Sequence, residues 1–268
     1  DALGQVAGGA FGEVLKTAKA PMLILGQGAL RGPEGAAVLG QARKLAESCN
    51  LVREDWNGFN VLQSAASRVG GLEIGFVPQQ GGRDVAGILD GAAKGEIEFV
   101  YLLGADEIDM GRLGKAFVVY QGHHGDAGAH RADVVLPGSA YTEKSGIYVN
   151  TEGRPQMTRA AVVAPGEAKE DWAILRALSE KAGKALPYDS LDQLRKALFS
   201  AAPHLQKLNV TTPARWESFG GEGAVTARAF QLPIANYYMT DPISRASETM
   251  AKCTAAFIAP ASGTGTHG

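Results

Sequence analysis

Short runs of apolar residues alternate with longer amphipathic segments along the first half of the chain. Each run ends at a glycine or a polar turn, and the runs lie at 21–25, 97–103, 116–120 and 132–138. Between them, apolar residues recur at helical spacing from Glu34 to Ser48 and from Arg83 to Lys94. Continuous apolar strands that alternate with helices are typical of a parallel sheet covered on both faces. We therefore expect an α/β fold.

Four further helices are predicted from helical spacing together with signals at their ends. Glycines close two of them, and the pattern S-x-x-Q, which opens at Ser190, is a capping box that starts a third. The fourth follows Asp241-Pro242 and has one apolar face. With approximate ends, these helices are expected at Asn60–Val69, Glu170–Ala182, Ser190–Ala201 and Ile243–Phe257.

The pattern changes after Gly138. Apolar segments at 147–150 and 160–163 flank a polar stretch, which suggests an antiparallel pair or an extended excursion. Residues 207–235 show no clear period, so we expect an irregular loop or arm there. We therefore predict an α/β domain at 1–202, an arm and final helix at 203–258, and a disordered tail at 259–268.

Composition and charge exclude several classes of protein. Apolar residues make up 45% of the 268 residues, which argues against global disorder. The formal net charge of −2 argues against a strong sequence-independent hold on nucleic acid, which needs a basic surface. No run approaches the roughly 20 apolar residues of a spanning helix, so we expect no direct membrane insertion. The start, Asp1–Gly4, lacks the features of a signal peptide, and we expect upstream sequence.

The chain has two cysteines, Cys49 and Cys253. A disulfide framework needs more cysteines, and an iron–sulfur cluster of the usual kind takes four thiolates. We expect two buried or free thiols in a reducing compartment and no metal site in this chain.

A glycine turn follows the first apolar run. Gly26-Gln27-Gly28 begins like the dinucleotide-binding fingerprint, in which glycines let the backbone approach a pyrophosphate at a helix N-terminus. Arg31 stands at the third glycine position, and Pro33 follows. A structural tight turn is the favoured interpretation, and nucleotide binding remains the alternative.

A loop after the third run holds His123, His124, Asp126 and His130. Histidines with a carboxylate suggest a metal, but the glycines between them remove the rigid spacing of a zinc enzyme. A hydrogen-bonded structural loop is favoured over a ligand or interface site, and both are favoured over a metal. No spacing of acids or serines assembles a catalytic centre, so no catalytic residue is predicted.

Several segments resemble the C-terminal part of the large iron–sulfur subunits of respiratory complex I, NADH:ubiquinone oxidoreductase. They are QGHHGDAGA at 121–129, ADVVLPG at 132–138, AYTEKS at 140–145, YVNTEGR at 148–154, YYMTDPISRAS at 237–247 and TMAKC at 249–253. The segments around 132–156 and the Glu170-Asp171-Trp172 helix are also similar to the wider molybdopterin oxidoreductase superfamily. That resemblance implies a Rossmann-like layer within a larger domain.

The resemblance also implies roles for particular residues. Residues that match pterin-facing positions of molybdenum relatives are Asn150, Glu152, Gly153, Arg154 and Gln156. The complex I branch keeps the fold without molybdenum, so these residues are expected to hold the fold or a domain contact. Other structural or interface candidates are His123, His124, Asp126, Tyr238 and Met250.

The expected function is a structural and assembly role in the peripheral arm of complex I. The iron–sulfur clusters are expected in an N-terminal part of the same subunit or in partner subunits, and no cofactor is expected in this chain. The expected partners are other peripheral-arm subunits, at the matrix side of the mitochondrial inner membrane or at the cytoplasmic face of a bacterial one. The alternative is a cofactor-binding oxidoreductase domain that retains a pterin or a dinucleotide.

Overall fold

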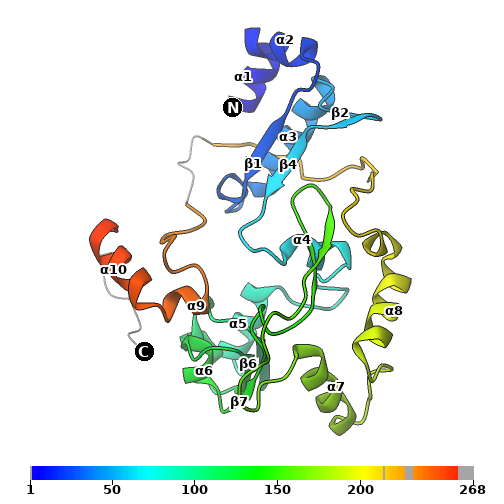
Figure 1. The fold of residues 1–268 in the computed structure, drawn as a ribbon. Coiled ribbons are helices and arrows are strands. Elements are labelled where there is room, and N and C mark those ends of the chain that lie inside the picture. Colours follow the sequence, from blue (N-terminus) through cyan, green and yellow to red (C-terminus); the bar gives the residue numbers. More distant parts are fainter. Residues whose placement is uncertain (1, 214, 227–231, 259–268) are drawn as a thin grey trace. The chain divides into compact units, whose positions relative to one another are not determined.

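The computed structural model describes residues 2–213, 215–226 and 232–258 (Figure 1). Their contacts divide the chain into two compact units built from interleaved segments. Unit 1 contains 1–70, 148–156 and 207–235, and unit 2 contains 71–147, 157–206 and 236–268. The domain division predicted at residue 202 stays a prediction, and the predicted disordered tail lies outside the described residues.

Unit 1 begins with two short helices and a parallel strand pair. Its elements before residue 63 are α1 (Ala2–Gly8), α2 (Ala10–Thr17), β1 (Leu23–Gly26), the 3₁₀ turn η1 (Gln27–Ala29), α3 (Gly35–Ser48), β2 (Val52–Arg53), β3 (Trp56–Asn57) and β4 (Phe59–Leu62). β1 pairs in parallel with β4, with Leu23 opposite Phe59. The predicted strand and helix at 21–48 are confirmed. Asn50 adopts a left-handed conformation, with φ of 54°, directly after α3.

The predicted helix Asn60–Val69 is wrong. Its first residues belong to β4, and only Arg68–Glu73 forms a helix, α4, with Gly70 and Gly71 inside it. The pairing of β4 with β1 explains the difference, because Phe59 and Val61 suit a strand and gain ladder hydrogen bonds there.

The irregular arm predicted at 207–235 packs against α3 within unit 1. The backbone of Gly221 donates a 2.7 Å hydrogen bond to Ala36 O. A side chain at Gly40 would lie 2.3 Å from Gly221 O, so a glycine is needed where the two backbones meet. The rings of Trp216 and Phe219 lie 4.9 Å apart and both contact Phe59. The arm is therefore an ordered cover of α3 where it is described.

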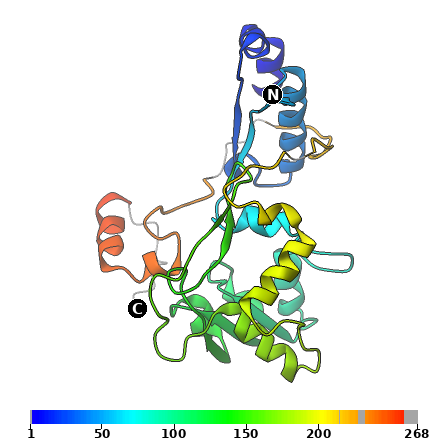
Figure 2. The same cartoon turned by 45° about the vertical axis from the view of Figure 1, so that its right-hand side comes forward.

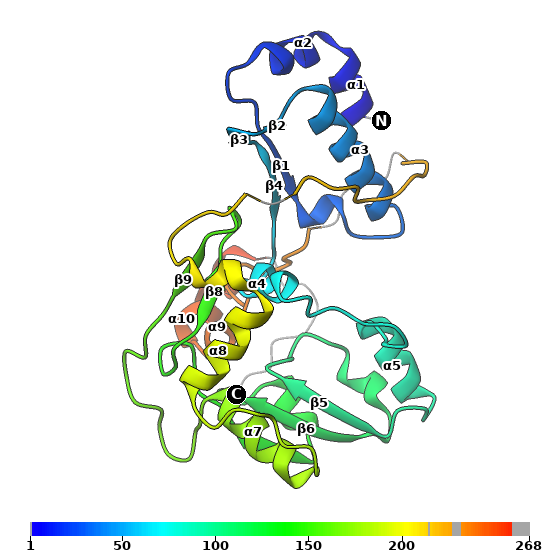
Figure 3. The same ribbon diagram turned by 90° about the vertical axis from the view of Figure 1, so that its right-hand side faces the viewer.

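Unit 2 contains a three-stranded parallel sheet. The elements are α5 (Val85–Ala93), β5 (Phe99–Leu103), η2 (Met110–Leu113), β6 (Phe117–Gly122), α6 (Ala127–Arg131) and β7 (Val134–Pro137), and the strand order is β5-β6-β7. One face of the sheet packs against α5 (Figure 3) and against η2. Buried side chains of that core include Leu89, Leu102, Leu113, Val118 and Tyr120. The three strands and the helix predicted here are confirmed.

The fold class is confirmed as α/β with parallel strands flanked by helices. The expectation of one sheet covered on both faces is corrected in two respects. The parallel strands form separate sheets, β1-β4 and β5-β6-β7. On the second face of β5-β6-β7, Phe99 and Phe117 remain 55% and 48% exposed.

A hairpin follows the three-stranded sheet. β8 (Ile147–Val149) pairs with β9 (Pro155–Met157), and the flanking bonds Asn150 N to Arg154 O and Thr158 N to Gly146 O make the pair antiparallel. The antiparallel pair was expected with 160–163 as the second strand. The strand that pairs with β8 is instead β9, because a tight turn at 150–154 reverses the chain and β9 begins at Pro155.

The C-terminal part of unit 2 is helical. It comprises α7 (Asp171–Lys181), α8 (Leu191–Ala201), η3 (Pro203–Gln206), α9 (Pro242–Arg245) and α10 (Glu248–Phe257). The predicted capping box at Ser190 is formed, with its hydroxyl accepting from Gln193 N. The last helix is interrupted, because the Ser247 side chain caps a new helix by accepting from Met250 N. Figure 2 shows α9 in orange and α10 in red, beside the green segment that contains β6 and β7. Among the described helices, none combines the length and apolar character needed to cross a bilayer.

Candidate functional site

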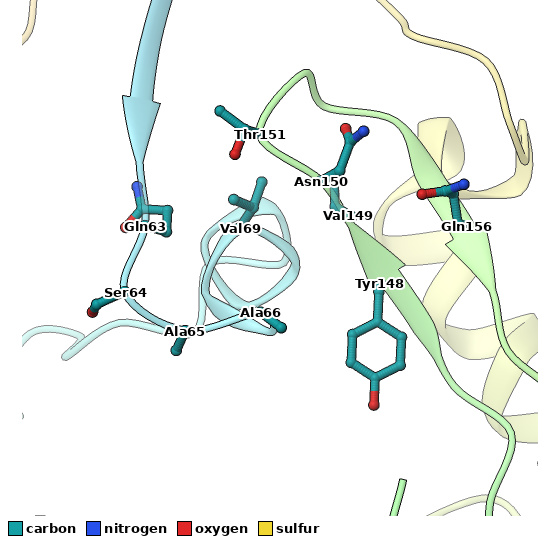
Figure 4. Close-up of a pocket in the computed structure, with 10 residues that line it drawn as sticks. All are labelled: Gln63, Ser64, Ala65, Ala66, Val69, Tyr148, Val149, Asn150, Thr151 and Gln156. Carbon is teal, nitrogen blue, oxygen red and sulfur yellow. The ribbon is translucent and has the colours of Figure 1, made fainter. Parts of the chain in front are cut away.

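A cleft of about 410 Å³ lies within unit 1 (Figure 4). One wall is the segment that leads from β4 into α4, and the other is the β8–β9 hairpin. The lining residues are Gln63, Ser64, Ala65, Ala66, Val69, Tyr148, Val149, Asn150, Thr151 and Gln156. Of the five residues that match pterin-facing positions, the cleft brings together Asn150 and Gln156.

The turn of the hairpin uses its own polar groups. The Asn150 side-chain carbonyl accepts 3.0 Å bonds from the backbone N–H groups of Glu152 and Arg154. Gly153 has φ of 77°, a conformation that side chains rarely adopt. The Arg154 guanidinium lies 3.3 Å from Glu152 and donates a 2.7 Å bond to Asn209 O. These residues therefore hold the turn and tie it to the arm.

The molybdopterin cofactor that the wider family implies does not fit this lining. The cofactor carries phosphate, and anions are bound in proteins by cations or by helix N-termini. The described residues that line the cleft include no charged side chain. Arg68, next to Val69, and Arg154, in the hairpin, are not among the lining residues, and Arg154 is paired with Glu152. No step of chemistry is derived through this group.

The turn at Gly26-Gln27-Gly28 does not lead directly into a helix. η1 intervenes, and α3 does not begin until Gly35. Glu34 stands at the start of α3, where a phosphate would bind, and its carboxylate accepts bonds of 2.7 and 3.1 Å from the hydroxyl and N–H of Thr226 in the arm. The geometry agrees with the favoured structural turn.

A second group of polar residues lies in unit 2, at the carboxyl ends of β5 and β6. In parallel sheets this is the edge where ligands commonly bind. Asp126 caps α6 by accepting a 2.8 Å bond from Ala127 N, and it also pairs with the Arg245 guanidinium from α9. Arg245 lies 3.4 Å from both Glu107 and the Met239 carbonyl oxygen. Burial lowers the pKa of Arg245, but the two carboxylates outweigh it and raise that pKa. The C-terminal segment thus places a cation at the sheet edge.

Tyr120 joins this edge to the core. Its hydroxyl donates a 2.8 Å bond to Asp106, whose second oxygen accepts from Gly128 N at 3.0 Å. A side chain at Gly128 would lie 2.6 Å from the Tyr120 ring, so α6 approaches the sheet through a glycine. Burial, followed by the bond to Asp106, raises the pKa of Tyr120. The tyrosine therefore stays protonated as a donor.

A chain of hydrogen bonds crosses the second face of the sheet. Tyr101 donates to the side-chain oxygen of Gln121, and Gln121 donates a 2.8 Å bond to Asp171 at the start of α7. Asp171 also pairs with Lys144. Gln121 is fully buried, and burial raises the pKa of Tyr101, with the Asp171 charge adding to the effect. These bonds fix the N-terminus of α7 on the sheet.

His123 and His124 lie beside this chain. Their Nδ1 atoms are 2.7 Å apart, so one ring donates and the other accepts. Burial lowers the pKa of His123, and the neighbouring His124 and Lys144 lower it further. The negative charges of Asp171 and Glu143 raise it, but by less. The favoured prediction of a hydrogen-bonded loop agrees with this geometry. Within the described residues, no group of three or more His, Cys, Asp or Glu side chains is arranged to hold a metal ion.

The two remaining candidates, Tyr238 and Met250, lie in the C-terminal segment of unit 2. The Tyr238 ring lies 6.2 Å from Phe257, and its backbone N–H donates to the Asn236 side chain at 2.9 Å. Met250 is half-buried in α10, a helix without a buried residue. Neither residue contributes a polar side-chain group to the sheet edge.

Arg245, Asp106, Gln121 and Asp171 are among the residues around this sheet that sequence spacing missed. Arg245 and Asp126 are 119 positions apart, so no local pattern joins them. A usable signal existed for Gln121, which is a polar residue at the end of an otherwise apolar strand. Asp171 was placed by resemblance in a motif, without a role.

The chain is similar along most of its length to named relatives. It is 46% identical to the NADH-ubiquinone oxidoreductase 78 kDa subunit, mitochondrial, of Neurospora crassa over 92% of this chain and 34% of the relative. It is 42% identical to the 75 kDa subunit of Reclinomonas americana, over 92% and 36%. For the 78 kDa subunit of Candida albicans the identity is 44%, over 93% and 35%. The chain thus spans about a third of the length of these relatives.

Two family models match different parts of the chain. One describes the C-terminal region of the NADH-ubiquinone oxidoreductase subunit designated G, and it matches residues 193–253. The model for molybdopterin oxidoreductase matches residues 2–181, which include both parallel sheets and the cleft. The chain therefore belongs to the molybdopterin oxidoreductase family.

Proposed function

We propose that the chain is a structural and assembly part of the peripheral arm of respiratory complex I, with other subunits of that enzyme as its partners. The observation that carries the proposal is the similarity to 75 and 78 kDa subunits over more than nine-tenths of this chain. The match of 193–253 to a subunit-specific C-terminal model supports the same assignment. The polar loops agree with a structural role, because their side chains bind one another and the backbone.

The clusters that carry electrons are proposed to lie in another part of the subunit or in neighbouring subunits. Cys49 is fully buried among apolar side chains of unit 1, and Cys253 lies in α10 of unit 2. Two thiols in separate units do not make the four-thiolate set of a usual cluster. The proposed location is the matrix side of the mitochondrial inner membrane, supported by the mitochondrial names of relatives.

Native electrophoresis tests this proposal. Detergent-solubilised membranes of the source cells are separated, and the chain is detected with an antibody beside an in-gel stain for NADH oxidation. The chain is expected in the band that oxidises NADH and transfers electrons to ubiquinone. Its recovery in a different assembly without that activity would refute the proposal.

The alternative is a domain that retains a pterin or dinucleotide. The cleft of about 410 Å³, with the amides of Asn150 and Gln156 in its lining, is the observation that speaks for this second function, and the lack of a charged side chain among the described lining residues speaks against it. Gentle purification, denaturation and mass spectrometry of the released small molecules separate the two functions. A stoichiometric pterin or dinucleotide supports the second, and its absence from a preparation that keeps NADH oxidation supports the first.

A further inference from the structure

Residues 236–258 form a segment of unit 2 that contains α9 and α10 (Figure 2). None of these residues is buried. Much of the hydrogen bonding that shapes the segment is internal, because Asp241 caps α9 and Ser247 caps α10. The Asn236 side chain donates a further internal bond of 3.1 Å to the Thr254 hydroxyl. The segment is therefore shaped by its own contacts and adds no buried side chain to the core of the unit.

Arg245 joins this segment to the sheet. Among the described residues, each hydrogen bond or ion pair between 236–258 and the rest of the chain is made by its guanidinium, with Asp126 and Glu107 as the acceptors. Glu107 lies in the loop after β5 and is exposed, whereas Asp126 follows β6 and its side chain is 8% exposed. One guanidinium thus bridges the loops at the carboxyl ends of two neighbouring strands.

The groups around Arg245 are those that a guanidinium binds best. Its Nε donates to Asp126, and its Nη1 donates 3.4 Å bonds to Glu107 and to the Met239 carbonyl oxygen. Carboxylates suit the planar donor fork of a guanidinium better than a point charge. The positive charge of Arg245 also reaches Tyr120, where it opposes the rise in pKa that burial causes. The sheet edge where ligands commonly bind is therefore bound to a side chain of the same molecule.

One nitrogen of this guanidinium has no acceptor. Nη2 of Arg245 is buried and lacks a hydrogen-bond partner within the part of the chain that the structure describes. A buried donor without a partner costs free energy, so a fully paired guanidinium would bind more tightly than this one. The contact therefore combines strong charge pairing with incomplete hydrogen bonding, which suits a contact that opens while the sheet stays folded.

The two sides of this contact belong to regions that match different family models. Asp126 and Glu107 lie within 2–181, the region that matches molybdopterin oxidoreductase. Arg245 lies within 193–253, the region that matches the C-terminal model of the subunit designated G. In unit 2, the guanidinium therefore attaches the subunit-specific region to the fold of the wider family.

We infer that the edge at the carboxyl ends of β5 and β6 is a guanidinium-binding site, and that residues 236–258 are a latch that occupies it through Arg245. The closed latch keeps other ligands from this edge. Its release opens a site that prefers a planar guanidinium to a cation without N–H donors. The inference goes beyond the proposed function, because it concerns contacts within the chain and does not depend on which partners the chain has.

Carboxyl labelling of the intact native protein tests the site. Carbodiimide and glycine ethyl ester convert accessible carboxylates to amides, and mass spectrometry measures the labelled fraction at Asp126. In Arg245→Ala this fraction is expected to rise at least about fivefold, because the Asp126 side chain is only 8% exposed while the latch is closed. Methylguanidinium at about 20 mM is expected to remove at least about half of that rise, and tetramethylammonium, which has no N–H donor, is expected to remove none.

Arg112→Ala is the matched control, since Arg112 pairs with Asp90 in the same unit and both side chains are exposed. Labelling of Asp90 is expected to change less than about twofold and not to respond to methylguanidinium, because an exposed pair is weak. Unchanged labelling of Asp126 in Arg245→Ala overturns the inference. A rise that both cations reverse, or that neither reverses, overturns it as well.

Amide exchange of the same variant distinguishes a latch from a part of the core. In Arg245→Ala, residues 236–258 are expected to lose protection at least about tenfold, because isolated helices as short as α9 and α10 are marginal in water. The strands β5, β6 and β7 are expected to keep their protection. Loss of protection across these strands, or retained protection of 236–258, overturns the inference. Recovery of the chain outside complex I instead contradicts the proposed function and leaves the latch unaffected.

Discussion

Two polar loops of this protein, each with a glycine, have different structural roles. The Asn150–Arg154 turn of unit 1 closes on itself, because its side chains bind backbone groups within four residues, with one bond to the arm. The loop from His123 to Asp126 in unit 2 instead connects β6 to Arg245, which is more than a hundred positions away. The first loop shapes a local turn, and the second fastens distant parts of the chain. Substitutions in the second loop are therefore expected to lower the free energy of unfolding by more than substitutions in the first.

The largest expected effect comes from Asp126→Ala. The substitution removes the cap of α6 and leaves the Arg245 charge without its most buried partner. Removing one member of a buried ion pair costs several kcal/mol, and partial exposure of Arg245 reduces this to about 3 kcal/mol of unfolding free energy. Urea denaturation measures it, with the exposed Glu167→Ala as the control. A loss of unfolding free energy as small as that of Glu167→Ala would show that the contact between Asp126 and Arg245 does not stabilise the fold.

Gln121→Leu is expected to have the next largest effect. It removes the buried amide between Tyr101 and Asp171, which leaves both without that partner. Loss of hydrogen bonds to buried groups is expected to lower the unfolding free energy by about 2 kcal/mol. Amide exchange should localise the loss to the first turn of α7. If amide exchange becomes faster in α8 by as much as in α7, the hydrogen bond from Gln121 to Asp171 does not specifically hold the start of α7.

Asn150→Ala is expected to cost less, about 1 kcal/mol, because it removes two local bonds at a partly exposed turn. Thermal unfolding is a suitable measurement. Thr151→Ala is the matched control, since Thr151 is exposed on the same turn. A cost comparable to that of Asp126→Ala would contradict the contrast between the two loops.

The smallest expected effect is a pH dependence. The pKa of His123 is lower in the folded protein than its ordinary value of 6.5, so the unfolded chain takes up the proton first on acidification. Stability is therefore expected to fall as the pH drops below about 6.5 and to level off below the folded pKa. His123→Gln should make that part of the pH profile shallower, and Thr151→Ala, a change at an exposed residue that does not titrate, should leave it unchanged. Equal profiles for both variants would count against a role for His123.

The sequence predicted elements whose signals are local. The strand and helix at 21–48 and the helix that begins at Ser190 each carry apolar runs or capping residues that act within a few positions. Asn60–Val69 failed because a short apolar segment can be a strand or a helix, and pairing with β1 decided between them. The packing of the arm on α3 had no period to detect, since two glycines and two aromatic rings make the contact.

The candidate sites likewise differ in whether their contacts are local in the sequence. The turn at 150–154 was not predicted, although an asparagine, a glycine and an arginine within five residues give a local signal for it. The sheet edge could not be assembled, because Asp106, Asp126 and Arg245 come from three separate segments. Resemblance drew attention to the segments around His123 and Arg245, and only the structure shows that they meet.

The interleaving of the two units has a consequence for how the chain tolerates damage. The polypeptide passes between them after residues 70, 147, 156, 206 and 235. A single nick by a protease at one of these points leaves the units joined by the other passages, so nicked protein should remain in one piece without denaturant. A premature stop near residue 206 removes the cover of α3 from one unit and Arg245 from the other. Late truncations should therefore act as defects of both units at once.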